Sequence, residues 1–459
     1  MTRPSPTETA APGAAGPTKA SATGAIGGRG AALGIGAGNL LEGFDWGSYA
    51  LFAPFFAAQI FGGHDPAAAL LASLAVFAVG FVARPVGAVL FGRLADRVGR
   101  RPVLALTIGS VALGCLLIGL CPTHDRAGIL APAVLLVARL LQGLGHGGEL
   151  PTAQTYLTEL APREHRGLWS SLSYVSGSIG GLAGSALGAV LAGALGPEAM
   201  NTVGWRVPFL LGAALGLFAL VIRVRLPESA VFAQRPEGER QPSLAGGLRA
   251  VPSALARVVG LTAGITVVYY TWSSNTVAYA ITARHLAPGP ALWAFTGGLA
   301  VFLLALPVWG ALSDRIGRRP ALLLAGVPLT VLLVPLDRLA DGGPWSLFAA
   351  TAIALGLLAC PLSAGIAVYA ELFPTGVRAA GLGLPYAVTV ALFGGTAPYL
   401  QTWLDHTGRP ALFDYYSVAA MVLTLLTVWS LPETRALDLR MVPLSGVRRQ
   451  ARPAMGRGG

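Results

Sequence analysis

Several charged residues of this sequence lie inside long apolar segments, where a charge is costly to bury. Glu42 and Asp45 lie in one such segment, and Arg139, His146 and Glu149 lie in another. A charged side chain at membrane depth costs roughly 2.5–3.5 kcal/mol on insertion scales, so these residues require a partner or a function. Carboxylates and a histidine can exchange protons, and an arginine can neutralise a carboxylate or bind an anion.

Helical spacing would place these groups on two polar stripes. At about 100° per residue, the first stripe is roughly 60° wide and contains Gly38, Glu42, Asp45 and Tyr49. The second stripe is about 80° wide over ~15 Å of rise and contains Arg139, Gln142, His146 and Glu149. We therefore expect both stripes to line a cavity or to meet each other.

The acids and arginines at this depth are unequal in number, which points to proton binding. Glu42, Asp45 and Glu149 face two arginines, Arg84 and Arg139, so one carboxylate lacks a permanent cation. A buried carboxyl in that position is easily protonated, because desolvation and like charge both disfavour its ionised form. Asp45 and Glu149 are the predicted proton carriers, followed by Glu42. Arg84 and Arg139 are predicted to pair with the acids or to bind a substrate anion.

Two other interpretations stay open at this point. The arginines could simply neutralise the acids and lock the helices together. His146 is a candidate proton relay, because an unperturbed histidine titrates near pH 6.5, at about working pH. A lone histidine on a helix can equally be a hydrogen-bonded packing residue.

Polar and aromatic residues supply the remaining candidates for a binding site. The second half of the sequence carries almost no charge at depth, so its contribution must come from rings, amides and hydroxyls, which suit a small polar metabolite. The predicted substrate-binding residues are Asn39, Tyr49, Gln142, Tyr270, Trp272, Asn275 and Tyr386. Each of them could instead serve core packing or an interfacial belt.

The elements that carry these residues are apolar segments long enough to cross a bilayer. Of the 459 residues, 54% are hydrophobic and 12% are charged, which excludes an ordinary soluble domain. A helical span of ~30 Å takes roughly 20 residues, and the alternating pattern of barrel strands is missing. Twelve transmembrane helices are predicted, over residues 31–60, 67–91, 102–121, 127–160, 168–195, 204–224, 254–283, 290–313, 320–338, 345–372, 380–404 and 410–430.

Charge in the loops sets the expected orientation. The formal charge of +11 comes mainly from arginines in the two terminal segments and in alternate loops, and the positive-inside rule places these in the cytoplasm. The positive charge therefore does not indicate that the protein binds nucleic acid. The expected organisation of this multi-pass cell-membrane protein is a disordered cytoplasmic tail (1–30), a six-helix bundle (31–224), a cytoplasmic linker (225–253), a second six-helix bundle (254–430) and a basic cytoplasmic tail (431–459).

Cofactor, metal and enzyme chemistry have no support in the sequence. Lys19, in the N-terminal tail, is the only lysine, so a P-loop for ATP is excluded. Cys115, Cys121 and Cys360 lack the spacing of a metal site or of a disulfide framework. The chain also lacks a hydrolase motif or a recognisable nucleophile–base pair. We predict no cofactor, no metal and no enzymatic activity.

An internal repeat divides the chain into two related halves. Residues 92–102 (GRLADRVGRRP) return as residues 310–320 (GALSDRIGRRP), and Leu-Pro-Glu at 226–228 returns at 431–433. Parallel repeats of six helices are used by one class of transporter, with the substrate site between the halves near the bilayer midplane.

The repeated loop Asp-Arg-x-Gly-Arg-Arg resembles the signature of the major facilitator superfamily. Within it, residues 38–49, 139–149 and 205–209 are similar to the first, fourth and sixth helices of the metabolite:proton symporters, which include permeases for α-ketoglutarate, citrate, shikimate and proline/betaine. The resemblance implies an all-α integral membrane fold, with twelve transmembrane helices in two pseudo-symmetric six-helix bundles.

The resemblance also implies charged latches that close the cytoplasmic side. The predicted gate residues are Asp96, Arg97, Arg100, Arg101, Glu159, Arg166, Asp314, Arg315, Arg318, Glu371 and Arg378. The alternative is that these arginines only follow the positive-inside rule.

The function predicted from these observations is secondary active transport. We expect a monomer that moves a small polar metabolite, an organic acid or a zwitterion, with protons as the coupling ion and membrane lipids around it. Export by proton antiport is the main alternative, although the fifth helix lacks the Gly-Pro pair typical of drug:proton antiporters. A channel or sensor would not need paired latches.

Overall fold

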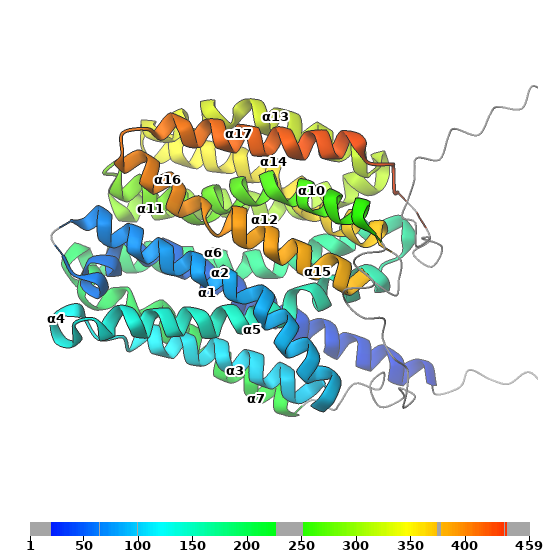
Figure 1. The fold of residues 1–459 in the computed structure, drawn as a ribbon, viewed down its shortest axis with the longest axis horizontal. Coiled ribbons are helices and arrows are strands. Elements are labelled where there is room, and N and C mark those ends of the chain that lie inside the picture. The colour runs from blue at the N-terminus through cyan, green and yellow to red at the C-terminus, as the bar shows by residue number, and fades with distance from the viewer. Residues whose placement is uncertain are drawn as a thin grey trace, which may run out of the picture.

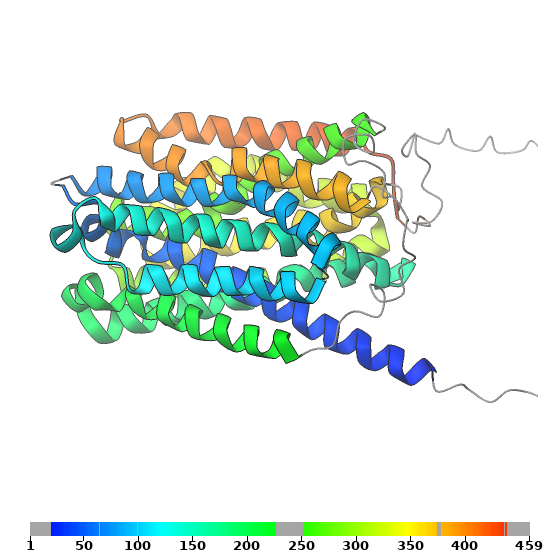
Figure 2. The same ribbon diagram turned by 60° about the horizontal axis from the view of Figure 1, so that its bottom comes forward.

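The computed structural model describes residues 20–63, 65–98, 100–225, 251–373, 378–435 and 437. These residues form long helices that run side by side, and none of them belongs to a strand. In Figure 1 the first half, blue to green, lies below the second half, green to red. Figure 2 brings the first half forward.

Six long helices make up the first half. They are α1 (Ala20–Phe61), α2 (Pro66–Val98), α3 (Arg100–Gly119), α5 (Leu130–Leu160), α6 (Arg166–Ala199) and α7 (Arg206–Arg225). Shorter pieces connect them: α4 (His124–Ala127), a 3-10 turn (Arg163–His165) and a π-helical turn (Met200–Gly204). Near its end α6 bends at Gly196, where φ is 73°, a value that glycine adopts without strain.

Two of the six spans of the second half are broken in their middle. The first joins α10 (Pro252–Tyr270) to α11 (Thr276–Thr282) through the π-helical turn Thr271–Asn275. The fifth joins α15 (Arg378–Thr389) to α16 (Ala397–His406) through the π-helical turn Val390–Gly394. The continuous helices are α12 (Pro288–Ile316), α13 (Arg318–Leu339), α14 (Pro344–Leu372) and α17 (Pro410–Ser430), with a 3-10 turn at Ala340–Gly342. Breaks of this kind often lie at functional sites.

The arrangement confirms the predicted fold class. Within the described residues, nine helices are long and apolar enough to cross a membrane. The other three predicted spans are α1, which carries Glu42 and Asp45, the shorter α7, and the interrupted pair α15–α16. Large apolar side chains such as Leu304 and Val331 point outward and are exposed, as expected of a lipid-facing surface.

The first helix begins within the segment that the sequence predicts to be a tail. The predicted tail covers residues 1–30, and α1 begins at Ala20. The prolines that argued for disorder all precede Ala20, and the next proline in the chain is Pro54, so nothing prevents the helix from extending through this Ala- and Gly-rich stretch. Residues 226–250 of the predicted linker, and the C-terminal tail beyond residue 437, lie outside the described residues.

Close contacts through glycine fix the helices that carry the charged residues. A Cβ on Gly147 of α5 would lie 2.0 Å from the carbonyl oxygen of Arg84 on α2, and one on Gly180 of α6 would lie 2.0 Å from that of Leu40 on α1. Only glycine allows the backbones to come this close. The α5 helix is thereby held close to α2, and α6 close to α1.

Candidate functional site

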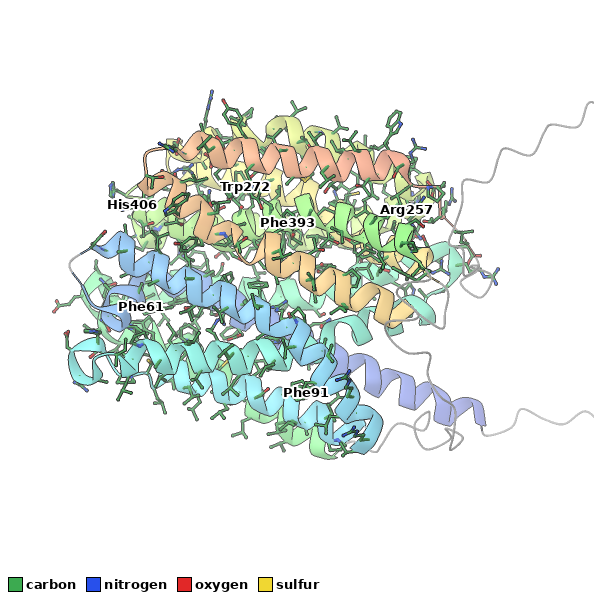
Figure 3. All side chains as sticks on the ribbon, viewed as in Figure 1. Phe61, Phe91, Arg257, Trp272, Phe393 and His406 are labelled. Atoms are coloured by element: carbon green, nitrogen blue, oxygen red, sulfur yellow. The ribbon has the colours of Figure 1, made fainter. Side chains whose placement is uncertain are left out.

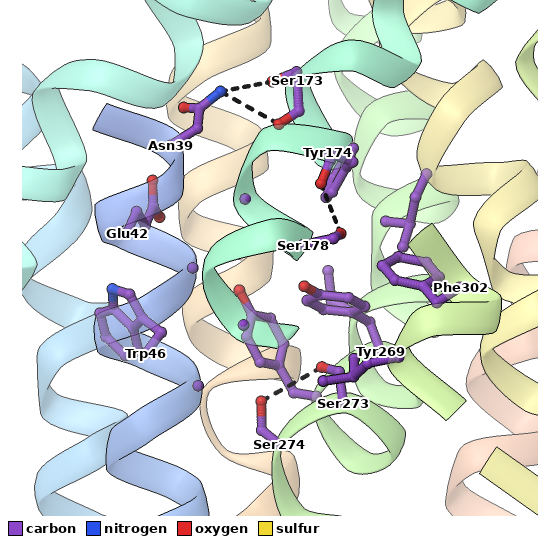
Figure 4. Close-up of a pocket in the computed structure, with 18 of the residues that line it drawn as sticks. Asn39, Glu42, Trp46, Ser173, Tyr174, Ser178, Tyr269, Ser273, Ser274 and Phe302 are labelled. Atoms are coloured by element: carbon purple, nitrogen blue, oxygen red, sulfur yellow. Dashed lines mark hydrogen bonds between the residues drawn. The ribbon is translucent and has the colours of Figure 1, made fainter. Parts of the chain in front are cut away.

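A cavity lies between the two halves and is lined by residues of both (Figure 4). Its walls come from α1, α2 and α6 of the first half and from α10, α12, α14 and α15 of the second. Protein atoms leave about 1090 Å³ of space in it, a volume that includes its open side. A cavity is therefore present at the interface where the internal repeat predicted a binding site.

The wall of the first half contains two buried ion pairs. The Nη2 atom of Arg84 lies 3.1 Å from Oε1 of Glu42, and both residues line the cavity. The Nη1 atom of Arg139 lies 3.4 Å from Oδ2 of Asp45, behind the cavity wall. Arg139 is fully buried and Asp45 is 1% exposed. The two polar stripes thus meet, as their spacing predicted.

Other polar groups surround the Asp45 carboxylate. The Gln142 amide donates to its Oδ1 at 2.5 Å, and the Cys115 thiol donates to the same oxygen at 3.3 Å. Arg139 in turn donates to the Gln142 amide oxygen at 2.8 Å. Cys115 was not among the predicted site residues, and nothing in its spacing indicated this contact.

Aromatic rings cover the two arginines. The Arg84 and Arg139 guanidinium carbons lie 4.1 and 4.2 Å from the ring centroid of Trp46, and that of Arg139 lies 4.0 Å from the Tyr49 ring. Cation–π contacts of this kind contribute more once the groups are desolvated. They help to explain how two guanidinium groups are tolerated at this depth.

His146 lies between the two ion pairs. Its Nδ1 is 4.0 Å from Oε2 of Glu42, and its Nε2 is 3.5 Å from Oδ2 of Asp45. Glu149, the fourth residue of the predicted proton-coupling set, lies on α5, but its side chain is outside the described residues.

The predicted substrate-binding residues fall into two groups. Asn39, Tyr270 and Tyr386 line the cavity. The other four are buried beside it or away from it: Tyr49, Gln142, Trp272 and Asn275.

Each of these four has contacts that account for its position. The Tyr49 hydroxyl donates to the carbonyl oxygen of Ser73 at 3.0 Å, and Gln142 binds Asp45. Asn275 donates to the amide oxygen of Gln401 on α16 at 2.7 Å. Trp272, labelled in Figure 3, packs in a hydrophobic core that includes residues of both halves. Trp272 and Asn275 lie in the π-helical turn Thr271–Asn275, which their residue types did not reveal.

Sequence reasoning missed several residues of the cavity wall. Tyr174 of α6 and Tyr386 of α15 approach each other across the cavity, with their hydroxyl oxygens 3.2 Å apart. Tyr269, Ser273 and Ser274 also line it (Figure 4). Tyr269 belongs to the same polar and aromatic cluster of the sequence as Tyr270, although it was not among the predicted substrate-binding residues.

An ion pair and two backbone hydrogen bonds join the two halves at the end of the molecule where the repeated loops lie. Arg166 of α6 donates to Oε1 of Glu371 on α14 at 2.8 Å. Arg318 lies 2.7 Å from Asp314 and 3.5 Å from Glu371. The backbone N–H groups of Gly167 and Leu168 donate to the two oxygens of Asp314 at 2.8 and 2.9 Å. Four of the predicted gate residues therefore form one buried network.

The remaining seven predicted gate residues are not part of this network within the described part of the chain. Arg97 and Arg315 are exposed. The side chains of the other five lie outside the described residues: Asp96, Arg100, Arg101, Glu159 and Arg378.

The segment after α17 adds contacts that were not predicted. Thr434 donates to Oε2 of Glu371 at 2.6 Å, and Glu433 accepts the backbone N–H groups of Arg318 and Arg319 at 2.8 and 3.1 Å. A carboxylate is stabilised at the start of a helix, here α13. The repeated Leu-Pro-Glu was the signal that could have identified this role.

The fold and the site together define a class of protein. Two six-helix bundles enclose a cavity, one wall carries buried ion pairs, and charged contacts join the bundles at one end. This is the architecture of a secondary transporter with its site between two repeats.

Comparison with known proteins identifies the family. The model of the Major Facilitator Superfamily matches residues 35–287 and 261–455, and the chain belongs to this superfamily. It is 35% identical to the alpha-ketoglutarate permease of Escherichia coli over 86% of this chain and 92% of that protein. It is 31% identical to the citrate-proton symporter of Klebsiella pneumoniae (90% and 93% covered) and to the proline/betaine transporter of E. coli (88% and 83% covered).

These relatives confirm the predicted resemblance to the metabolite:proton symporter group. They are permeases, symporters and transporters, and this chain is likewise a multi-pass membrane transporter and not an enzyme. Among solved structures, the xylose transporter of E. coli in a partially occluded inward open conformation has a TM-score of 0.69 at 16% identity, over 88% of this chain and 97% of that one. This similarity supports the fold alone.

Proposed function

We propose that this protein is a proton-coupled symporter of a small polar metabolite that bears a carboxylate. The observation that carries the proposal is the Glu42–Arg84 pair in the cavity wall, because it brings an acid and a cation to the place where a solute would bind. The named solutes of the relatives, α-ketoglutarate, citrate, proline and betaine, all carry a carboxylate.

The charge of the cavity wall favours a solute with one carboxylate. Among the described residues that line it, Arg84 is the one cation and Glu42 the one acid. A second carboxylate on the solute would meet hydroxyl groups and rings but no second cation. An organic acid with one carboxylate or a zwitterion therefore fits best. Hydroxyl groups such as that of Ser273 would bind polar groups of the solute, and rings such as that of Tyr269 would bind a methylated cation.

Alternating access would expose this cavity to one side of the membrane at a time. We propose that the network around Glu371 is the gate on the cytoplasmic side. The arginine-rich loops lie at that end of the molecule, and the positive-inside rule assigns such loops to the cytoplasm. The protein would then act as a monomer in the cell membrane with both termini in the cytoplasm.

Transport into vesicles tests the coupling. The purified protein is reconstituted without ATP, a pH gradient with an acidic exterior is imposed, and labelled L-proline, glycine betaine, α-ketoglutarate and citrate are offered in turn. We expect uphill accumulation of at least one compound, abolished by a protonophore. Accumulation that follows sodium and ignores pH contradicts proton coupling. Accumulation only under the reversed gradient indicates antiport, the alternative function.

Substitution of the cavity arginine tests the site itself. Arg84→Gln should lower counterflow of a carboxylate solute about 100-fold, because a charged hydrogen bond worth roughly 3 kcal/mol is removed. The exposed Arg338 offers a matched control, and Arg338→Gln should leave counterflow unchanged. Wild-type counterflow by Arg84→Gln would exclude Arg84 as the carboxylate site.

A further inference from the structure

His146 is a buried ring whose two nitrogens each face a carboxylate. It is 2% exposed, and neither nitrogen has a hydrogen-bond partner within the described residues. Buried polar groups without partners are rare in folded proteins, because each costs the free energy of its lost hydration. Packing alone therefore does not account for a histidine at this position.

The two carboxylates that His146 faces differ in their access to the cavity. Glu42 lines the cavity, whereas Asp45 does not and is enclosed by Gln142, Cys115 and Arg139. A proton that arrives from the cavity meets Glu42 first. His146 lies between the two carboxylates, with one ring nitrogen facing each, and so offers a path from Glu42 to Asp45.

We propose that His146 relays protons between Glu42 and Asp45, and that a substrate carboxylate bound at Arg84 opens this relay. The inference rests on the proposed proton-coupled function. Arg84 holds one oxygen of Glu42 at 3.1 Å, while the other oxygen stays 4.0 Å from His146, beyond hydrogen-bond distance. A substrate carboxylate that takes over Arg84 frees Glu42 to rotate toward the ring. Binding of the solute and binding of the proton are then linked.

The relay step conserves protons and charge. Glu42, protonated from the cavity, gives its proton to the lone pair of His146 Nδ1, and the proton on Nε2 passes to the Asp45 carboxylate. Glu42 is left ionised, Asp45 is protonated, and the ring is neutral again with its proton on the other nitrogen. Release runs the same transfers in reverse: Asp45 returns its proton to Nε2, the Nδ1 proton passes to Glu42, and the starting tautomer is restored.

The charges around the ring are compatible with a transient positive charge. Glu42 and Asp45 on α1 face it directly, Arg84 on α2 and Arg139 on α5 are the partners of those acids, and the Cys115 thiol on α3 binds Asp45. Glu149 lies on the same helix as His146, with its side chain outside the described residues. Among the described side chains around the ring, two acids thus face two permanent cations.

Transport by His146→Gln tests the relay. Glutamine keeps polar atoms near both carboxylates but cannot carry a proton between them. Gradient-driven uptake of the panel compound that the wild type takes up best should fall about 100-fold, the scale of a lost proton-transfer group. Counterflow, which exchanges substrate without net proton movement, should fall much less. The control is His406→Gln, a half-exposed histidine that does not line the cavity, and this variant should retain both activities.

The outcomes separate this inference from the proposed function. If the wild type itself ignores the pH gradient, the proposed function fails. If the wild type responds and His146→Gln accumulates substrate equally well, or loses uptake and counterflow to the same degree, the relay is wrong.

A measurement without substrate provides a second test. In protein labelled with ¹⁵N-histidine, the resonance missing from His146→Gln belongs to His146. Its titration midpoint should change both in Glu42→Gln and in Asp45→Asn, because the ring faces both carboxylates. A His146 resonance that is insensitive to either substitution would overturn the proposal.

Discussion

The two walls of the cavity differ in their chemistry. The wall of the first half carries Glu42 and Arg84, with Asp45, Arg139 and His146 behind them. The wall of the second half consists of rings and hydroxyl groups and contains no charged residue within the described part of the chain. The charged groups are thus concentrated on one side of the cavity, and the rings and hydroxyl groups on the other.

Because of this difference, the two halves could move relative to each other without separating the buried ion pairs. The ion pairs Glu42–Arg84 and Asp45–Arg139 both lie within the first half, so a rigid-body motion of the halves leaves them intact. The pair Arg166–Glu371 crosses between the halves and must break when that end opens. Breaking a buried pair exposes its partners to water at the end of the molecule, where the cost is lower than at the membrane centre.

Loss of the carboxylate at Asp45 should have the largest effect on coupling. In Asp45→Asn the side chain keeps its shape and can still bind Gln142, but it cannot take up a proton. We expect uphill accumulation to disappear while exchange of bound substrate is retained to a measurable level. Both are measured in the same vesicles. Wild-type accumulation by the variant would rule out Asp45, and loss of both activities would indicate a binding or structural role.

A change at the gate should have an intermediate effect. Asp314→Asn weakens the contacts of Asp314 with Arg318 and with the N–H groups of Gly167 and Leu168. We expect counterflow to fall about tenfold, equivalent to about 1.4 kcal/mol, with normal amounts of protein in the membrane. Counterflow at the wild-type rate would show that this network does not gate transport.

Removal of a hydroxyl from the opposite wall should have the smallest effect. Tyr386→Phe removes the contact between the Tyr386 and Tyr174 hydroxyls and keeps both rings. The KM for counterflow should rise roughly two- to tenfold, since a neutral hydrogen bond contributes about 0.5–1.5 kcal/mol. The exposed Tyr415 provides the control Tyr415→Phe. A loss as large as that of Arg84→Gln would contradict the division of roles between the walls.

The charged part of the site could be predicted from the sequence, whereas much of the binding wall could not. Glu42, Asp45 and Arg139 stand out because a charge in an apolar segment is costly, and regular helical spacing is enough to bring them together. Tyr174 and Ser274 carry no such signal, because a tyrosine or serine is common in any helix. Asn275 was predicted to bind substrate because of its amide, but in the π-helical turn this amide binds Gln401 instead.

The sequence by itself determined the number of spans, their division into two related halves, and the residues that must be neutralised at depth. These follow from hydropathy, from the repeated loops at 92–102 and 310–320, and from the cost of burying charge. Only the tertiary structure decided that Glu42 faces the cavity while Asp45 is sealed behind it, and that His146 lies between them. The two acids share one helix face, so their spacing cannot separate them. The neighbouring helices α2, α3 and α5 do so, because they cover one carboxylate and leave the other open.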